Sequence, residues 1–336
     1  MLHLLALILS LAAAAAAAPA TRNARAGRTS PPSGCLTVGG SGTYKTVSAA
    51  VAKLSATSTA AQCIFIYKGT YNEQVYIPAL ASALAIYGET TDTSGFASNT
   101  VTITQGKSQD DVASNDLTAT LRASTPNLRV YNINLVNSRG KGSQALAVSA
   151  NADKQGYYGC QFKGFQDTIL AQKGNQVYAK CQIIGATDFV FGQKAIAWFE
   201  AVDIRVLTAK VGYVTANGRN SDSNPSYYVF NKATVSAAAG NIVKAGAYYL
   251  GRPWRNYARV VFQNSALSDV INPLGWAQWS PNDTRTDKVT FGEYGNTGAG
   301  ATGTRASFAK KLSAPLSIST ILGSSYKDWV DTTYLS

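Results

Sequence analysis

Two aspartates occupy the same place in an internal repeat of the chain. The segment Cys160–Leu170 (CQFKGFQDTIL) aligns with Cys181–Phe191 (CQIIGATDFVF), 21 residues later, and the alignment places Asp167 opposite Asp188. If the two segments form successive coils of a solenoid, residues one period apart lie on neighbouring strands, about 4.8 Å apart. The two carboxyl groups would then be neighbours.

Two carboxyl groups this close repel each other when both are ionised, so their pKa values separate. One then suits the role of base or nucleophile and the other the role of acid. The alternative is a pair of solvated turn residues, since aspartate favours turns. The repeat and the apolar run Phe189-Val190-Phe191 favour the chemical interpretation.

The N-terminus is typical of a secretory signal peptide, with a short apolar stretch that ends at Ala18-Pro19-Ala20. We expect a signal peptide over 1–20, a flexible leader over 21–33 and a single domain over 34–336, in a secreted, extracellular protein. The only histidine is His3. The mature chain would therefore lack histidine, which excludes Ser-His-Asp and Cys-His triads and histidine-based zinc sites.

The four cysteines indicate disulfides, because their number is even and the chain is expected to be exported. The repeat places Cys160 and Cys181 on adjacent coils, so we predict that they pair. This leaves Cys35 to pair with Cys63. A Cys160–Cys181 bond would fix the register of the two coils that carry the aspartates.

The formal net charge of +12 indicates an acidic partner. No run of lysine and arginine is dense enough for a nucleic-acid-binding arm, and beyond the N-terminus no apolar stretch is long enough to cross a membrane. For an exported chain, an acidic polysaccharide is the expected partner. One sequon, at Asn282, is a possible glycosylation site.

The fold is predicted to be all-β, because short apolar or alternating segments recur at near-regular spacing without intervening helical patterns. A parallel β-helix fits the repeat, and a sandwich or propeller is the alternative. A capping helix is expected over Thr43–Leu54, a loop insertion over Gln109–Ala119 and a cover for the open end of the solenoid over Tyr326–Leu335. The expected strands lie within Cys63–Ile77, Leu84–Gly88, Val101–Thr104, Leu128–Val136, Gln144–Ser149, Gly156–Phe162, Gln176–Ile184, Ala195–Val206, Tyr227–Val235, Tyr248–Leu250 and Ala258–Gln263.

Five blocks in one order together resemble the pectin methylesterases, also called pectinesterases. They are GTYNEQV (Gly69–Val75), SQALAV (Ser143–Val148), GFQDTIL (Gly164–Leu170), TDFVFG (Thr187–Gly192) and YLGRPW (Tyr249–Trp254). The resemblance implies a right-handed parallel β-helix that hydrolyses the C6 methyl esters of galacturonosyl units in pectin. Methanol and pectate would be released through a covalent aspartyl-acyl intermediate, without metal or cofactor.

The resemblance also implies roles for the charged residues. Asp188 corresponds to the family nucleophile, and Arg252 to the arginine that orients it. A guanidinium beside a carboxylate lowers the carboxyl pKa and fixes its orientation through two hydrogen bonds. Asp167 corresponds to the general acid and base. Glu73 fits the opening block, and we interpret it as structural.

Polar and aromatic residues complete the implied site. Gln144 and Gln166 correspond to the amides that stabilise the oxyanion of the tetrahedral intermediate. Trp254 corresponds to an aromatic of the sugar cleft, where a flat ring can pack against a pyranose. Phe165 and Phe189 adjoin the two aspartates, and we predict that they bind substrate together with Trp254. The alternative is that their rings pack inside the coil.

Other classes of protein share some of these features. A retaining glycosidase also needs two close carboxyl groups. A lyase of the same fold would need clustered carboxylates for Ca²⁺, and Asp110, Asp111 and Asp116 are the only cluster. A non-catalytic wall-binding module would need neither acids nor amides. We expect an enzyme that acts as a monomer on pectin, with a glycosidase or lyase as the alternative.

Overall fold

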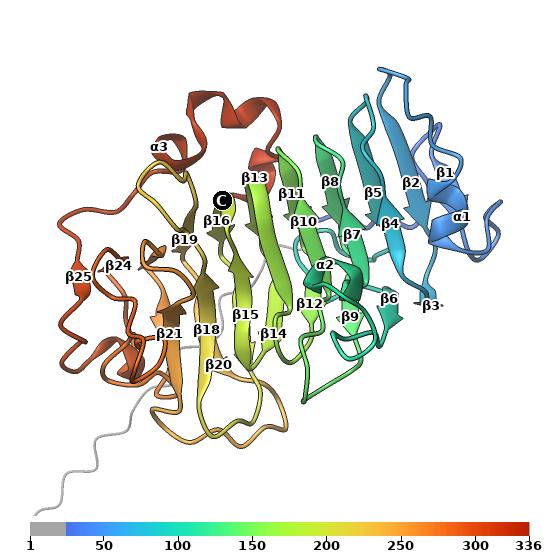
Figure 1. The fold of residues 1–336 in the computed structure, drawn as a ribbon. Helices are drawn as coiled ribbons and strands as arrows, with labels where there is room; N and C mark the ends of the chain where they lie inside the picture. Colours follow the sequence, from blue (N-terminus) through green and yellow to red (C-terminus); the bar gives the residue numbers. More distant parts are fainter. Residues whose placement is uncertain (1–24, 336) are drawn as a thin grey trace, which may run out of the picture.

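A computed structural model of the chain describes residues 25–335. The signal peptide predicted over 1–20 and the start of the predicted leader lie outside the described residues. The strands form a solenoid in which all pairings between named strands are parallel, as in a parallel β-helix (Figure 1). The predicted fold is confirmed.

Three stacks of parallel strands run along the solenoid, and the long strand β13 belongs to two of them. The first stack carries the aspartates and contains β4 (Val75–Ile77), β7 (Leu121–Ala123), β10 (Val148–Asn151), β13 (Ile169–Ala179), β15 (Thr187–Gly192), β18 (Gly212–Asn217) and β21 (Tyr248–Pro253). The second contains β1 (Leu36–Val38), β2 (Gln62–Ile66), β5 (Leu84–Gly88), β8 (Leu128–Tyr131), β11 (Gln155–Tyr158), β13, β16 (Lys194–Glu200), β19 (Tyr227–Asn231), β22 (Arg259–Gln263), β24 (Thr290–Tyr294) and β25 (Ala309–Lys311). The third contains β3 (Gly69–Asn72), β6 (Val101–Gln105), β9 (Asn134–Asn137), β12 (Gln161–Lys163), β14 (Gln182–Gly185), β17 (Asp203–Val206), β20 (Thr234–Ala237) and β23 (Ala266–Leu267).

The repeat seen in the sequence is one coil of the solenoid. Gln161 of β12 lies opposite Gln182 of β14, and their side-chain amides are hydrogen-bonded at 2.7 Å. Later coils are longer, since Tyr213 of β18 pairs with Tyr249 of β21. The 21-residue period therefore holds in the coils around the two aspartates and not in the later ones.

The interior contains a continuous stack of aromatic rings. Adjacent rings are nearly parallel, with centroids 4.2–4.9 Å apart, and all five side chains are fully buried. The stack consists of Tyr157, Tyr178, Phe199, Phe230 and Phe262. Each such pair contributes about 0.5–1.5 kcal/mol beyond the burial of its area, so the stack stabilises coil-on-coil packing at the centre of the molecule.

The N-terminal helix is shorter than the predicted Thr43–Leu54. Helix α1 (Val47–Val51) buries its apolar side against β1, β2 and β4 at the N-terminal end of the solenoid (Figure 1). The carboxylate of Glu73 accepts hydrogen bonds from the backbone N–H groups of Val47 and Ser48 at 2.7 and 2.9 Å. Glu73 thus caps this helix, which agrees with the structural role expected for it.

The remaining helices are short: α2 (Asn115–Thr118), α3 (Ile318–Leu322), η1 (Ala299–Ala301), η2 (Ser324–Asp328) and η3 (Thr332–Tyr334). Helix α2 lies within the segment predicted to be a loop insertion. No helix in residues 25–335 combines the length and hydropathy needed to span a membrane.

The C-terminal segment Tyr326–Leu335 does not cover the open end of the solenoid, so that prediction is wrong. Trp329 and Tyr334 instead pack on the side of the second stack, against Tyr131 and Tyr158. These two tyrosines belong to β8 and β11 and lie outside the main core. The segment Tyr326–Leu335 thus buries apolar surface that the second stack would otherwise expose.

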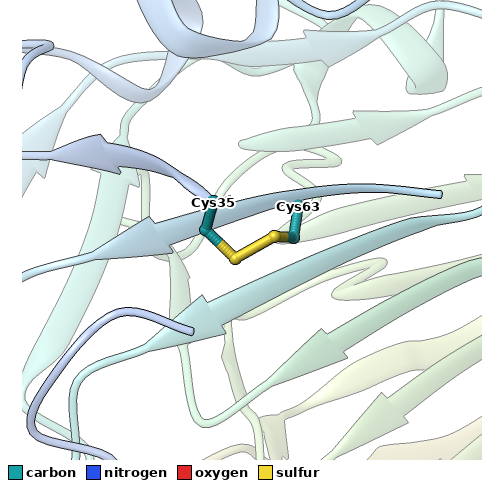
Figure 2. Close-up of a disulfide and its surroundings, with 2 residues drawn as sticks. All are labelled: Cys35 and Cys63. Carbon is teal, nitrogen blue, oxygen red and sulfur yellow. A yellow bond between two sulfur atoms is a disulfide. The ribbon is translucent and has the colours of Figure 1, made fainter. Parts of the chain in front are cut away.

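The two cysteine pairs behave differently. Cys35 and Cys63 form a disulfide with a Cα–Cα distance of 4.6 Å, as predicted (Figure 2). Cys160 and Cys181 are neighbours but remain free, buried thiols, so the predicted bond between them is wrong. The sulfur of Cys181 lies against the backbone N–H of Cys160 at 3.3 Å and donates to the carbonyl of Tyr157, while the thiol of Cys160 donates to the carbonyl of Val130. Both sulfurs thus make hydrogen bonds to backbone groups, and no disulfide joins them.

Candidate active site

Asp167 and Asp188 lie side by side on consecutive coils, as the repeat predicted. Gln166 and Thr187 form a parallel bridge, and the backbone N–H of Asp167 donates to the carbonyl of Thr187 at 3.0 Å. Both side chains come from residues that are only 7% exposed. They are therefore not solvated turn residues.

The backbone has the same unusual conformation at both aspartates. The φ angle is 64° at Asp167 and 51° at Asp188, in the left-handed region. Aspartate and asparagine tolerate this region better than other residues with a side chain, although such a conformation costs about 1–3 kcal/mol and tends to occur at functional sites. The two aspartates therefore share a backbone conformation as well as a place in the repeat.

Arg252 of β21 binds Asp188 through two parallel hydrogen bonds. Its Nε donates to Oδ1 at 2.9 Å and its Nη2 donates to Oδ2 at 2.7 Å. The two residues are 64 positions apart, but the register brings their strands together, since Phe191 pairs with Ala216, which pairs with Arg252. The predicted pair is present, and both partners are largely buried.

Two aromatic rings enclose the guanidinium of Arg252. Its central carbon lies 4.0 Å from the centroid of Tyr213 and 4.3 Å from that of Trp279, and its Nη1 contacts the carbonyl of Trp279 at 3.5 Å. Such contacts fix the plane of the guanidinium. Sequence reasoning missed both rings. Neither residue lies in a repeat or in a family block, so the sequence carried no signal for them.

The surroundings of the two carboxyl groups give them different pKa values. Burial, and then the charge of Asp188, raise the pKa of Asp167 well above its usual range. Burial also raises the pKa of Asp188, but the hydrogen bonds and charge of Arg252 oppose that rise. Arg252 was expected to lower this pKa, and its contribution has that direction although burial outweighs it. Asp167 therefore binds a proton more tightly than Asp188, whose ionised form Arg252 stabilises.

Asn115 is a neighbour of Asp167 that sequence reasoning did not identify. It is the first residue of α2, and its Nδ2 donates to Oδ2 of Asp167 at 3.4 Å. The polar stretch Gln109–Ala119 carries no repeat or family block that would mark this residue. The loop insertion predicted there contributes directly to the site.

Gln144 and Gln166 lie on adjacent coils next to Asp167. The backbone N–H of Ala145 donates to the carbonyl of Gln166 at 3.1 Å, which joins the two coils at this point. Both glutamine side chains are half-buried, and within residues 25–335 neither amide makes a hydrogen bond to the protein. The amides thus have donors that a bound molecule can use.

The predicted aromatic residues of the cleft divide into three cases. Trp254 is half-buried and packs on Phe191 with a centroid distance of 6.0 Å, beside the arginine two residues earlier. Phe165 is partly buried and packs against the main core. Phe189 is fully buried in that core, so its predicted contact with substrate is wrong. Its ring occupies the space left by the missing side chain of Gly185, where a Cβ would lie 2.4 Å from it.

The acidic cluster that a calcium-dependent lyase would need is not assembled. Asp110 pairs with Arg139 at 2.8 Å and Asp116 pairs with Arg122 at 2.6 Å. Asp111 accepts hydrogen bonds from Ser108. Among residues 25–335, no three histidine, cysteine, aspartate or glutamate side chains converge in a way that could hold a metal ion.

Comparison with known proteins places this site in a family, since a model of the family described as Pectinesterase matches residues 35–312. The chain belongs to the pectinesterase family. It is 55% identical to a pectinesterase of Aspergillus aculeatus over 313 residues, which covers 92% of the chain and 95% of that relative. It is 46% identical to pectinesterase A of Emericella nidulans, covering 97% of the chain and 98% of the relative.

Solved pectinesterase structures have the same fold. The pectin methylesterase of Aspergillus niger superposes with a TM-score of 0.86 at 43% identity, covering 92% of this chain and 100% of the other. The enzyme from carrot superposes with a TM-score of 0.81 at 29% identity, covering 90% and 97%. Together with the family match, these relatives make the chain a carboxylic ester hydrolase.

Proposed function

We propose that this protein hydrolyses the C6 methyl esters of galacturonosyl units in pectin, releasing methanol and pectate, with Asp188 as the nucleophile. The observation that carries the proposal is the bidentate Arg252–Asp188 pair beside a second buried carboxyl group. The pair keeps one carboxylate ionised and aimed, and the neighbouring carboxyl of Asp167 supplies a proton.

In the first half-reaction, a carboxylate oxygen of Asp188 attacks the ester carbonyl carbon. The half-buried amides of Gln144 and Gln166 donate hydrogen bonds to the oxyanion that forms. As the intermediate collapses, the bond to the methoxyl oxygen breaks and Asp167 gives that oxygen its proton. Methanol leaves, and the galacturonosyl unit remains attached to Asp188 as an anhydride.

In the second half-reaction, the same two carboxyl groups act, and Asp167 now serves as the base. Asp167, now ionised, takes a proton from a water molecule, whose oxygen attacks the acyl carbon of the anhydride. The bond to Asp188 breaks, and its carboxylate returns to Arg252. The product is a free galacturonate carboxyl group, and Asp167 is again protonated for the next cycle.

The remaining expectations belong to the same proposal. Trp254, which directly follows the strand β21 that bears Arg252, would pack against the sugar. The catalytic domain is proposed to span 34–336 and to act as a monomer. The Cys35–Cys63 disulfide and the net charge of +12 support a secreted protein that acts on an acidic polymer.

Incubation with highly methylated pectin tests the proposal against its alternatives. We expect methanol and an equal amount of acid, with no new reducing ends and no ultraviolet-absorbing unsaturated ends. New reducing ends would indicate a glycosidase, and unsaturated ends would indicate a lyase. Binding without any product would indicate a wall-binding module, and any of these three outcomes would overturn the proposal.

A further inference from the structure

Asn115 faces the proton-carrying carboxyl group of the site. Its Nδ2 lies 3.4 Å from Oδ2 of Asp167, which is long for a strong hydrogen bond. Contacts of catalytic groups are often loose in the absence of substrate and tighten during the reaction. The geometry therefore identifies Asn115 as a hydrogen-bond partner of Asp167 whose contact can shorten during the reaction.

Helix α2 holds Asn115 firmly in this position. The hydroxyl of Thr118 donates to the carbonyl of Asn115 at 2.8 Å and accepts from the backbone N–H of Leu146 at 3.1 Å. The next residue, Asp116, binds Arg122 at 2.6 Å and accepts from the hydroxyl of Ser149 at 2.7 Å. The residues that follow Asn115 thus fasten the short helix to β7 and β10 of the first stack.

The side-chain oxygen of Asn115 is buried and has no hydrogen-bond partner. In residues 25–335 only one other buried side-chain atom shares this property, the Oδ1 of Asn99. An unpaired buried acceptor costs about 1–3 kcal/mol, so its presence beside an ionisable group calls for a physical reason.

We propose that Asn115 is a positioning residue for Asp167 that serves both of its protonation states, an inference that rests on the proposed function. The amide N–H bonds to the ionised carboxylate. When the carboxyl is protonated, the amide turns over, and its oxygen accepts the O–H. Nitrogen and oxygen exchange places in that turn, so the carboxyl keeps a partner at the same position.

Because the side-chain oxygen of Asn115 is unpaired, rotation of the amide costs little free energy. Turning the amide breaks no hydrogen bond other than the one to Asp167, because the oxygen has none to lose. A charged partner could not act in this way, since it would favour one protonation state. The charged groups that face Asp167 are Asp188 of β15, which raises its pKa, and Arg252 of β21, which lowers it. Asn115 is a neutral hydrogen-bond partner of Asp167.

The test compares Asn115→Ala with Asn99→Ala in steady-state methanol release from methylated pectin. Asn99 is the matched control, because it also has an unpaired buried oxygen but binds Gly159 and Asn134 instead of the acids. We expect kcat of Asn115→Ala to fall about tenfold with KM changed less than about twofold. We expect Asn99→Ala to keep the wild-type kcat.

A near-isosteric variant, Asn115→Asp, tests the role through the pH profile of kcat/KM. A residue with a purely structural role would leave that profile unchanged. Its ionised carboxylate cannot donate and repels the charge on Asp167, so Asp167 holds its proton to higher pH. Since acylation needs that proton, the alkaline limb of the kcat/KM profile should move up by about one pH unit.

Three results would overturn the inference. One is a wild-type kcat for Asn115→Ala. Another is an unshifted alkaline limb for Asn115→Asp at an unchanged Tm, which decides the question even if Asn115→Ala does not fold. The third is an equal loss of kcat in Asn99→Ala. Wild-type methanol release separates these results from a failure of the proposed function, since an inactive wild type would overturn both.

Discussion

Asp167 and Asp188 have the same position in the repeat, the same left-handed backbone and the same burial, yet they have different partners. Asp188 is bound by the guanidinium of Arg252, whereas Asp167 meets the neutral amide of Asn115. The solenoid thus supplies two equivalent carboxyl groups. Side chains from a later coil and from a loop make them different.

The largest expected effect comes from Asp188→Asn. Asparagine keeps the size and tolerates the left-handed backbone, so the variant should fold, but it has no carboxylate to attack the ester. We expect turnover of methylated pectin to fall by about 10⁴-fold, measured as methanol release at an unchanged far-ultraviolet circular dichroism spectrum. Near-wild-type release would remove Asp188 from the role of nucleophile.

Arg252→Lys should have the next largest effect. A lysine keeps the positive charge but cannot form two parallel hydrogen bonds to Asp188 or stack between two rings. We expect kcat/KM to fall by about 10²-fold. Arg205→Lys is the control, because Arg205 also pairs with an aspartate, Asp203, on the third stack. A loss in the control as large as in Arg252→Lys would argue against the orienting role.

A smaller effect is expected from Tyr213→Leu, which removes one of the rings against Arg252. A cation–π contact of this kind contributes about 0.5–2 kcal/mol, so kcat should fall by about fivefold. Tyr76→Leu removes a comparable contact with Arg122, at 4.6 Å, on a more exposed surface. Equal activity of Tyr213→Leu and wild type would show that the bidentate bond orients Arg252 without help from Tyr213.

The smallest expected effect is on thermal stability. The change in Tm at neutral pH should differ between variants of the two aspartates. Because the pKa of Asp167 is raised in the folded state, its contribution to stability is full at low pH and is lost as pH rises through the folded pKa. Asp167→Asn should therefore raise Tm at neutral pH by about 2 °C and leave it unchanged near pH 3. Asp188→Asn should give no such gain, because it leaves Arg252 without its carboxylate. Equal responses in thermal melts would contradict the distinction.

The sequence predicted the acid pair because its spacing is one coil, and it predicted Arg252 only through the family block around it. Between Asp188 and Arg252 the coils lengthen, so no period connects these residues. Asn115 and Trp279 lie on segments without a repeat, and only tertiary structure brings them to the site. Periodicity predicts neighbours within the stacks but not residues that arrive from loops.

A period also does not give the direction of a side chain. It placed Cys160 beside Cys181 correctly, but their sulfurs bind backbone groups, and no bond forms. Phe189 follows Asp188 directly, yet its ring turns into the core over Gly185. Adjacency along the solenoid therefore establishes neither a bond between two sulfurs nor the exposure of a side chain at the surface.

The placement of Asp167 and Asp188 on consecutive coils makes their separation a constant of the backbone. Hydrogen bonding between parallel strands sets the rise per coil at about 4.8 Å, whatever the length of the turns. Insertions in the turns can therefore reshape the surroundings of the acids without changing the distance between their two coils. Substrate preference can thus vary in such a solenoid while the spacing of the two acids stays fixed.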